Sequence, residues 1–402
     1  MQKIVEYLIQ HCEKLQHLPE DFVYLGVELV FALLLLMLFV APFAGIISFV
    51  ERRIAARAMD RIGPNRVGPQ GILQWLADGV KSLLKEDVVP SQADQFLFRL
   101  APYLVFVGMF AAFVVVPFSS SLIVADLNIG IFYLVAVTSI VVVGIMMSGW
   151  ASNNKYSLLG GMRSAAQIVS YEIPAGLSIL AVVIVAGSLS VQDIIKAQGA
   201  YPWQWFLFQN PLMPVAFISL FISSLAEGNR TPFDIPEAES ELVSGYSTEY
   251  SGMRFVFFYF EEWANLYLIA AVSTSLFLGG WNLPAGVAEW AVSKGVLLLH
   301  LLQFLTFFIK AMIVVFIIIQ LRWTLPRVRV DQLMSLCWKY LTPIGFFVSL
   351  GVAAWVVFFP QGVPLVSYAM SAGAGLLLVY FVYRVYYHLS YSQAPIELSP
   401  FV

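Results

Sequence analysis

Acidic side chains crowd one polar segment of the chain, residues 228–261, and they point to proton chemistry. Asp234 stands two residues before Pro236, a pattern typical of a helix start, where the helix dipole favours acidic residues. This local explanation covers only some of the carboxylates, because Arg230 and Arg254 are the only basic residues of the segment. Repulsion of this kind can couple a distant charge to protonation and loop movement. The segment and its flanks contain Glu227, Asp234, Glu237, Glu239, Glu241, Glu249, Glu261 and Glu262.

Two further charged residues, Glu172 and Lys310, lie several residues inside long apolar stretches. A charge within a membrane helix costs about 2.5–3.5 kcal/mol, so such residues usually face a polar interior and have a function. Both side chains can take up and release protons. Glu227, Glu261 and Glu262 stand nearer the ends of apolar stretches, where a location among lipid headgroups is an equally good interpretation.

Cysteine and histidine, the residue types that usually hold redox centres, are few and scattered in this chain. Cys12 and Cys337 stand too far apart for a disulfide framework, a zinc site or an iron–sulfur cluster. The net charge of −3 argues against nucleic-acid binding. We therefore expect no metal site and no bound flavin, haem or iron–sulfur cluster on this chain. The histidines are His11, His17, His300 and His388, too dispersed for a membrane cytochrome.

The elements that must position these charges are transmembrane helices. The chain is 60% apolar and 12% charged with a mean hydropathy of +0.81, whereas soluble domains carry about 25% charged residues. A bilayer core of about 30 Å needs roughly 20 apolar residues in a helix, and runs this long do not form β-barrels. We predict an all-α polytopic membrane protein, one integral membrane domain over residues 1–402. About nine spans are expected, at 26–50, 96–118, 129–150, 165–187, 211–227, 262–280, 296–320, 342–359 and 364–384.

Basic residues give the orientation of the spans. The loops after spans one, three, five and seven hold 15 of the 22 Lys and Arg residues, whereas the opposite loops hold only Lys196 and Lys294. By the positive-inside rule the odd-numbered loops are cytoplasmic and the N-terminus is outside. The first cytoplasmic loop, 51–95, contains apolar residues at three- and four-residue spacing between Ile72 and Leu84. This pattern predicts an amphipathic helix, either at the membrane interface or packed on the bundle.

Several motifs resemble a known family, the H subunit of bacterial NADH:quinone oxidoreductase, respiratory complex I. The resemblance covers residues 26–359, which would be an eight-helix family core, and leaves an N-terminal extension and an extra C-terminal helix at 364–384. The motifs are Glu51-Arg52-Arg53, residues 61–68, Ala77-Asp78, residues 85–87, residues 152–157, Ser170-Tyr171-Glu172, residues 230–234, residues 249–252, Lys310, Arg322, Pro326-Arg327 and Asp331-Gln332.

The resemblance implies two sets of site residues. The first span, the amphipathic helix and the sixth span would frame a tunnel through which quinone, ubiquinone or menaquinone, reaches a neighbouring subunit. The tunnel residues would be Arg52, Arg57, Arg61, Tyr259 and Phe260. A proton relay would couple quinone reduction to proton translocation through Glu172, Glu227, Arg230, Asp234, Glu237, Glu239, Glu249 and Glu262, and we add Lys310 to this set.

The resemblance also implies partners and a location. The partners would be the iron–sulfur subunits of the hydrophilic arm, the antiporter-like and small membrane subunits, quinone and membrane lipid, but no nucleic acid. The location would be the bacterial inner membrane. One alternative is the related subunit of a membrane-bound hydrogenase or another dehydrogenase. A secondary ion transporter would also explain Glu172 and Lys310, but it predicts internal repeats that the sequence does not show. A stand-alone enzyme is the weakest alternative, because the chain has no redox ligands.

Overall fold

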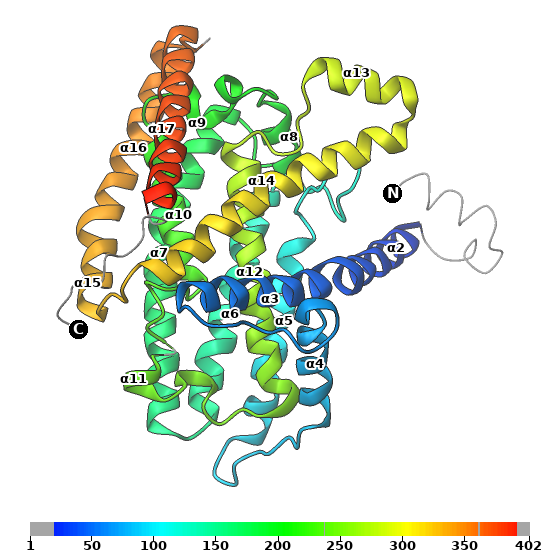
Figure 1. The fold of residues 1–402 in the computed structure, drawn as a ribbon, viewed down its shortest axis with the longest axis vertical. Coiled ribbons are helices and arrows are strands. Elements are labelled where there is room, and N and C mark those ends of the chain that lie inside the picture. Colours follow the sequence, from blue (N-terminus) through cyan, green and yellow to red (C-terminus); the bar gives the residue numbers. More distant parts are fainter. Residues whose placement is uncertain (1–19, 237, 361, 392–402) are drawn as a thin grey trace, which may run out of the picture.

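The computed structural model describes residues 20–236, 238–360 and 362–391, and over these residues the chain is helical with no strand. Long helices form a bundle in which most axes run in similar directions, while α2–α3 and α14 cross them obliquely (Figure 1). The long helices are α2 Glu20–Leu35, α3 Ala41–Ala58, α5 Gln95–Phe113, α6 Gly130–Ala151, α7 Lys155–Ala186, α10 Met213–Glu227, α12 Gly252–Phe277, α14 Val296–Thr324, α16 Thr342–Phe358 and α17 Pro364–Tyr391.

Short helices connect the long ones at the two ends of the bundle. The elements α8, α9 and α13 lie at one end, and α4 and α11 lie at the other (Figure 1). The π-helical segments Leu36–Val40 and Leu336–Leu341 join α2 to α3 and α15 to α16 without a break. The short elements are α4 Gln74–Leu84, α8 Val191–Lys196, α9 Phe206–Gln209, α11 Glu239–Leu242, α13 Ala285–Lys294, α15 Val330–Ser335, η2 Pro69–Gly71, η3 Pro202–Gln204 and η4 Gly245–Ser247.

The predicted all-α membrane fold is confirmed, with 8 helices of the described chain long and apolar enough to span a bilayer. The predicted span at 211–227 is the exception, because α10 has only 15 residues, fewer than the roughly 20 that a bilayer core requires. The count of nine therefore remains a prediction. The helix α10 packs against α7 and α12 inside the bundle, which explains its apolar composition without full contact with lipid.

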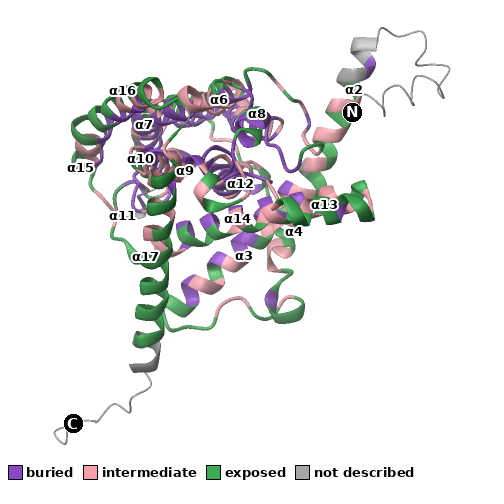
Figure 2. Cartoon of the chain, turned by 90° about the horizontal axis from the view of Figure 1, so that it is seen from above, coloured by how far each residue is buried: buried purple, intermediate pink, exposed green. Residues whose placement is uncertain are grey.

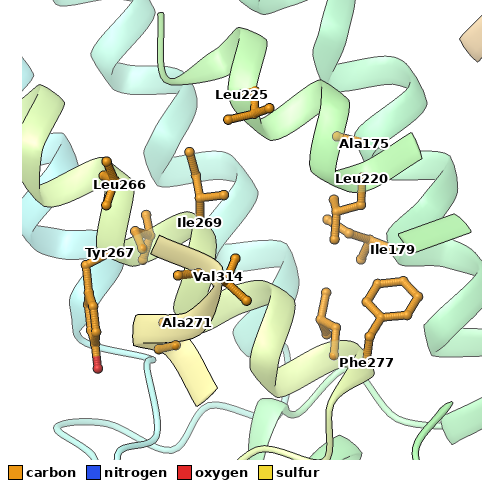
Figure 3. Packing of buried hydrophobic residues seen from close by; sticks show 14 of the residues in the cluster. Ala175, Ile179, Leu220, Leu225, Leu266, Tyr267, Ile269, Ala271, Phe277 and Val314 are labelled. Atoms are coloured by element: carbon orange, nitrogen blue, oxygen red, sulfur yellow. The ribbon is translucent and has the colours of Figure 1, made fainter. Parts of the chain in front are cut away.

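The core lies between α7, α10, α12 and α14, where Ile179, Leu220 and Phe277 point toward one another and Val314 belongs to the same buried cluster (Figure 3). Burial of these apolar side chains contributes about 1.5–3 kcal/mol each for the larger ones. Buried residues concentrate on these central helices, whereas α17 is exposed over most of its length (Figure 2). The core thus fixes α7, α10 and α12, the three helices that carry the predicted buried carboxylates.

Two segments differ from the predicted boundaries. The helix in the first loop, α4, has 11 residues and packs against α3 and α12; its apolar side chains Leu76 and Leu83 are 49% and 65% exposed. Whether α4 lies at the membrane interface remains a prediction. The acidic loop, expected over 228–261, ends at Ser251, because α12 begins at Gly252. Tyr259, Phe260, Glu261 and Glu262 therefore lie inside a helix.

Candidate functional site

A cavity of about 760 Å³ lies between α3, α4 and α12. Three predicted tunnel residues, Arg52, Tyr259 and Phe260, line it. Arg52 bridges α3 and α4 through an ion pair with Asp78, with 2.6 Å between Nη1 and Oδ2. The helices approach closely because Gly45 of α3 has no side chain; a Cβ atom there would overlap the ring of Trp75 of α4.

The other two predicted tunnel residues lie elsewhere. Arg61 follows the end of α3 and lines an adjoining cavity of about 490 Å³, which shares Arg52 and Trp263 with the first. Arg57 is exposed near the C-terminal end of α3 and lines neither cavity. The structure thus brings together four of the five predicted residues around two neighbouring cavities and leaves Arg57 outside them.

A network of four charged residues lies beside the second cavity, and two of them, Glu51 and Arg322, line it. Arg230 is 1% exposed and Glu51 2%, and Arg230 Nη1 lies 3.2 Å from both Glu51 Oε2 and Glu262 Oε1. Arg322 of α14 pairs with the same two carboxylates. Arg230 also donates to the Glu262 backbone carbonyl at 3.0 Å and lies over the Trp263 ring. Two positive and two negative charges therefore neutralise one another, with Arg230 and Glu51 buried and Arg322 25% exposed.

Gln167 of α7 fixes the chain on both sides of Arg230. Its amide nitrogen donates to the carbonyl oxygens of Ala226 at 2.7 Å and Phe233 at 2.8 Å. The amide thus holds the turn that follows α10 against α7. Because this turn carries Arg230, the hydrogen bonds determine where the guanidinium enters the bundle.

Glu51 and Arg322 belong to this network, although neither was predicted as a site residue. Both occur in the family-like motifs, and each terminates an apolar stretch, where a headgroup location is the ordinary explanation. The signal that could have found them is their opposite charge at the ends of two different spans. Only the tertiary structure shows that those ends meet, since 271 residues separate the two in sequence.

A series of carboxylates continues from Glu262 into the bundle. Glu261 is 6% exposed and interacts electrostatically with Glu262, Arg230 and Glu227. Glu227 in turn interacts with Glu172 of α7. Glu261 is therefore a further member of the series, which links α12, α10 and α7.

Two neighbouring hydroxyls of α6 contact the inner carboxylates. Ser139 Oγ donates to Glu172 Oε1 at 2.8 Å, and the Thr138 hydroxyl lies near the Glu227 carboxyl. Each hydroxyl also lies 3.0 Å from the backbone carbonyl of Val135. A hydroxyl can donate to the carbonyl when the carboxyl is protonated and to the carboxylate when it is ionised, so the pair can adapt to either protonation state.

Asp234 lies beside the charged network, outside the transmembrane helices. Burial and the neighbouring Glu262 raise the pKa of Asp234 to about 6, although Arg322, Arg327 and Arg230 oppose this shift. Its Oδ1 atom is buried without a hydrogen-bond partner within the described structure. The Asp234 carboxyl therefore gains or loses its proton close to neutral pH.

The raised pKa makes a testable stability prediction for Asp234→Asn. The unfolded chain releases the Asp234 proton near pH 4 and the folded chain near pH 6, so the ionised carboxylate lowers folding stability as pH rises through this window. We expect Asp234→Asn to stabilise the protein by up to about 3 kcal/mol above pH 6 and to have little effect below pH 4. Thermal unfolding of the purified complex at several pH values measures this. An equal shift in the exposed control Asp331→Asn would contradict it.

The remaining predicted relay residues occupy different surroundings. Glu249 accepts a hydrogen bond from Asn154 Nδ2 at 2.6 Å, at the start of α7. Lys310 donates to the carbonyls of Leu278 and Gly280 at 2.8 and 3.0 Å and lies over the Trp205 ring. Among the described residues its partners are thus carbonyls at the C-terminal end of α12, away from the acidic loop. Glu237 lies outside the described residues, and only the backbone of Glu239 is described.

The acidic loop is attached at Glu241, which pairs with Arg163 of α7 at 2.6 Å and with Arg327 at 2.7 Å. Hydrogen bonds and the two positive charges lower the pKa of Glu241. Across the described residues, no group of three or more His, Cys, Asp or Glu side chains could hold a metal ion.

Comparison with known proteins gives the family. Residues 30–353 match a family model described as NADH dehydrogenase. A protein of Anaeromyxobacter dehalogenans, named as the H subunit of an NADH-quinone oxidoreductase, is 50% identical over 353 residues, which cover 85% of this chain and 86% of that protein. Proteins of the same name from Phocaeicola vulgatus and Chlorobaculum tepidum are 45% and 49% identical, over 85% and 76% of this chain and 94% and 86% of their own lengths. The chain therefore belongs to the NADH dehydrogenase family, together with the H subunits of bacterial NADH-quinone oxidoreductases.

Proposed function

We propose that this subunit of complex I admits quinone through the cavity between α3, α4 and α12 and transmits its reduction to the buried carboxylates. The observation that carries the proposal is spatial continuity. The first cavity shares Arg52 and Trp263 with the second, whose wall contains Glu51 and Arg322. From there Glu262, Glu261, Glu227 and Glu172 follow one another into the bundle.

The walls of the first cavity suit a quinone. An isoprenoid tail is apolar and a quinone head accepts hydrogen bonds, so its passage requires apolar walls with a few polar contacts. Leu76, Val80 and Phe260 supply apolar surface, and Arg52 supplies donors at the junction of the two cavities. The volume of about 760 Å³ lies within the range of ordinary small-molecule sites.

The buried network suits electrostatic coupling. A change in charge near Arg52 acts on Glu51 and Arg322, which share their partners with Arg230 and Glu262. In a low-dielectric interior such interactions are stronger than in water and less screened by salt. The charge of the network therefore biases the protonation of Glu261, Glu227 and Glu172, which is the event that proton translocation requires.

The same proposal includes the partners and the orientation of the subunit. Flavin and iron–sulfur clusters lie on other subunits, with the hydrophilic arm over the cytoplasmic loops and the antiporter-like and small membrane subunits beside the bundle. The relatives' names favour a quinone-reducing complex over a hydrogenase. The location is the bacterial plasma membrane.

The test of the quinone passage is Arg52→Ala, with Arg57→Ala as its matched control. Arg52 lines both cavities whereas Arg57 lines neither, so only Arg52→Ala should raise the apparent KM for quinone. Loss of a charged hydrogen bond of about 1.5–3 kcal/mol predicts a rise of roughly tenfold or more. Quinone titrations of assembled complex, normalised to flavin content, measure it. An unchanged KM in Arg52→Ala, or an equal rise in Arg57→Ala, would remove Arg52 from the passage.

The test of orientation uses two exposed residues on either side of α14. In a chain with Cys12 replaced by serine, Ser293→Cys should react with an impermeant maleimide in intact spheroplasts. Asp331→Cys should react only in inverted vesicles, because basic residues surround it on the predicted cytoplasmic side. The native Cys337 is buried and contributes little background. The reverse labelling pattern would contradict the orientation.

A further inference from the structure

A third cavity lies at the end of the bundle opposite the acidic loop. It has a volume of about 630 Å³ and lies among η3, α9, the end of α16 and the start of α17. The elements α8, α9 and α13 mark this end in Figure 1, whereas α4 and α11 mark the end that carries the proposed quinone passage. This cavity shares no lining residue with the cavity between α3, α4 and α12.

The lining of this cavity is aromatic and neutral. Trp203, Trp355 and Tyr368 contribute rings, and the Trp203 and Tyr368 centroids lie 5.9 Å apart. Gln204, Gln209 and Asn210 contribute amides. Among the described residues, none that line the cavity is charged, so the site favours a neutral hydrogen-bonding group over an isolated anion or cation.

Asn210 supplies a donor that has no partner in the protein. The residue is 2% exposed, and its Oδ1 accepts from the backbone nitrogen of Leu212 at 2.9 Å, which fixes the orientation of the amide. Its Nδ2 atom is buried without a hydrogen-bond partner within the described structure. Buried polar groups are nearly always hydrogen-bonded, so we expect a bound molecule to supply an acceptor for the Asn210 amide nitrogen.

The position in the bundle identifies the kind of molecule that carries the acceptor. The spanning helices α7 and α16 end near this cavity and α17 begins there, so it lies at one surface of the membrane. Tryptophan and tyrosine are enriched at that depth. Beside the cavity, Phe358 and Leu365 are 76% and 78% exposed, and only 6% of the most apolar window of α17 is buried (Figure 2). We therefore expect the bound molecule to have a polar part in the cavity and an apolar part along α16 and α17.

We propose that this cavity binds the glycerol-ester region of a membrane phospholipid, with an ester carbonyl accepting from Asn210 Nδ2 and the acyl chains lying along α16 and α17. The lipid would fill the space between α9 and the α16–α17 turn. In this arrangement it fastens α17 to the bundle, since the direct packing of α17 is against α9 and η3.

The test uses the intact complex in phosphatidylethanolamine vesicles that contain a diacyl phosphatidylethanolamine with a photoactivatable group near its ester end. Irradiation and peptide mass spectrometry should locate labels within residues 203–210 and 355–368. Asn210→Asp keeps the acceptor for Leu212 and removes the donor, so we expect roughly three- to tenfold less labelling, relative to labelling at the exposed Leu376.

Val363→Trp provides a second variant, because it fills the cavity without changing Asn210 and should abolish the labelling. Equal labelling of the wild type and Asn210→Asp, or of the wild type and Val363→Trp, would overturn the proposal. Displacement of the label by excess decylubiquinone would overturn it as well, in favour of a quinone site. The readout requires no turnover, so its outcome is independent of the proposed quinone passage.

Discussion

Arg230→Met is expected to destabilise the protein by about 3–5 kcal/mol, the cost of removing one partner from a buried ion network. Methionine keeps much of the side-chain volume but leaves Glu51 and Glu262 with Arg322 as their remaining partner. It also removes the hydrogen bond to the Glu262 carbonyl and the contact with Trp263. The amount of assembled complex in native gels, together with its thermal inactivation, measures the effect.

Two variants make this result specific to the buried charge. Arg327→Met removes a partly exposed ion pair with Glu241, a kind of pair worth about 0–1 kcal/mol, and should assemble like the wild type. Adding Glu51→Gln to Arg230→Met removes one of the two carboxylates that Arg322 alone would then have to neutralise, and it should restore part of the lost stability. If Arg230→Met assembled as well as Arg327→Met, the network would not be important for folding.

Glu227→Gln is expected to lower quinone reduction and proton pumping together, by about a hundredfold or more, while NADH oxidation by an artificial acceptor survives. The substitution preserves volume and removes the ionisable group that lies between Glu261 and Glu172. Loss of a positioned proton-transfer group commonly costs on the order of 10² or more in rate. The artificial acceptor bypasses quinone, so it reports only on the hydrophilic arm.

The matched control is Glu289→Gln on α13, an exposed carboxylate far from the series. It should leave all three activities unchanged. Ser139→Ala should produce a smaller loss than Glu227→Gln, because it removes one hydrogen bond to Glu172 and keeps the carboxyl. Wild-type quinone reduction and pumping in Glu227→Gln would mean that Glu227 is an ordinary helix-end residue.

The long apolar runs predicted most of the fold, since burial in lipid dictates helices of defined length. The sixth span was predicted at 262–280, whereas α12 begins at Gly252. Arg254, Glu261 and Glu262 lowered the hydropathy of that first part. In the structure Arg254 pairs with Asp87 and Glu262 pairs with Arg230, and local composition cannot reveal these contacts.

The candidate site could likewise be predicted only in part from the sequence. The acidic loop and Glu172 could be predicted, because unusual residue types stand out in an apolar background. The pairing of Glu51 with Arg230 and Arg322 could not, because it joins α3, the turn after α10 and α14. The family resemblance implied Arg57 together with Arg52, yet of these two only Arg52 lines the cavity.

The attachment of the acidic loop at Glu241 makes that loop sensitive to ionic strength. Glu241 is 48% exposed in its ion pairs with Arg163 and Arg327, whereas Arg230 is shielded from solvent ions. At about 1 M salt the screening length falls to about 3 Å, so exposed pairs weaken while buried ones persist. Added salt should therefore weaken the ion pairs that attach the acidic loop at Glu241, while the buried ion pairs of Arg230 persist.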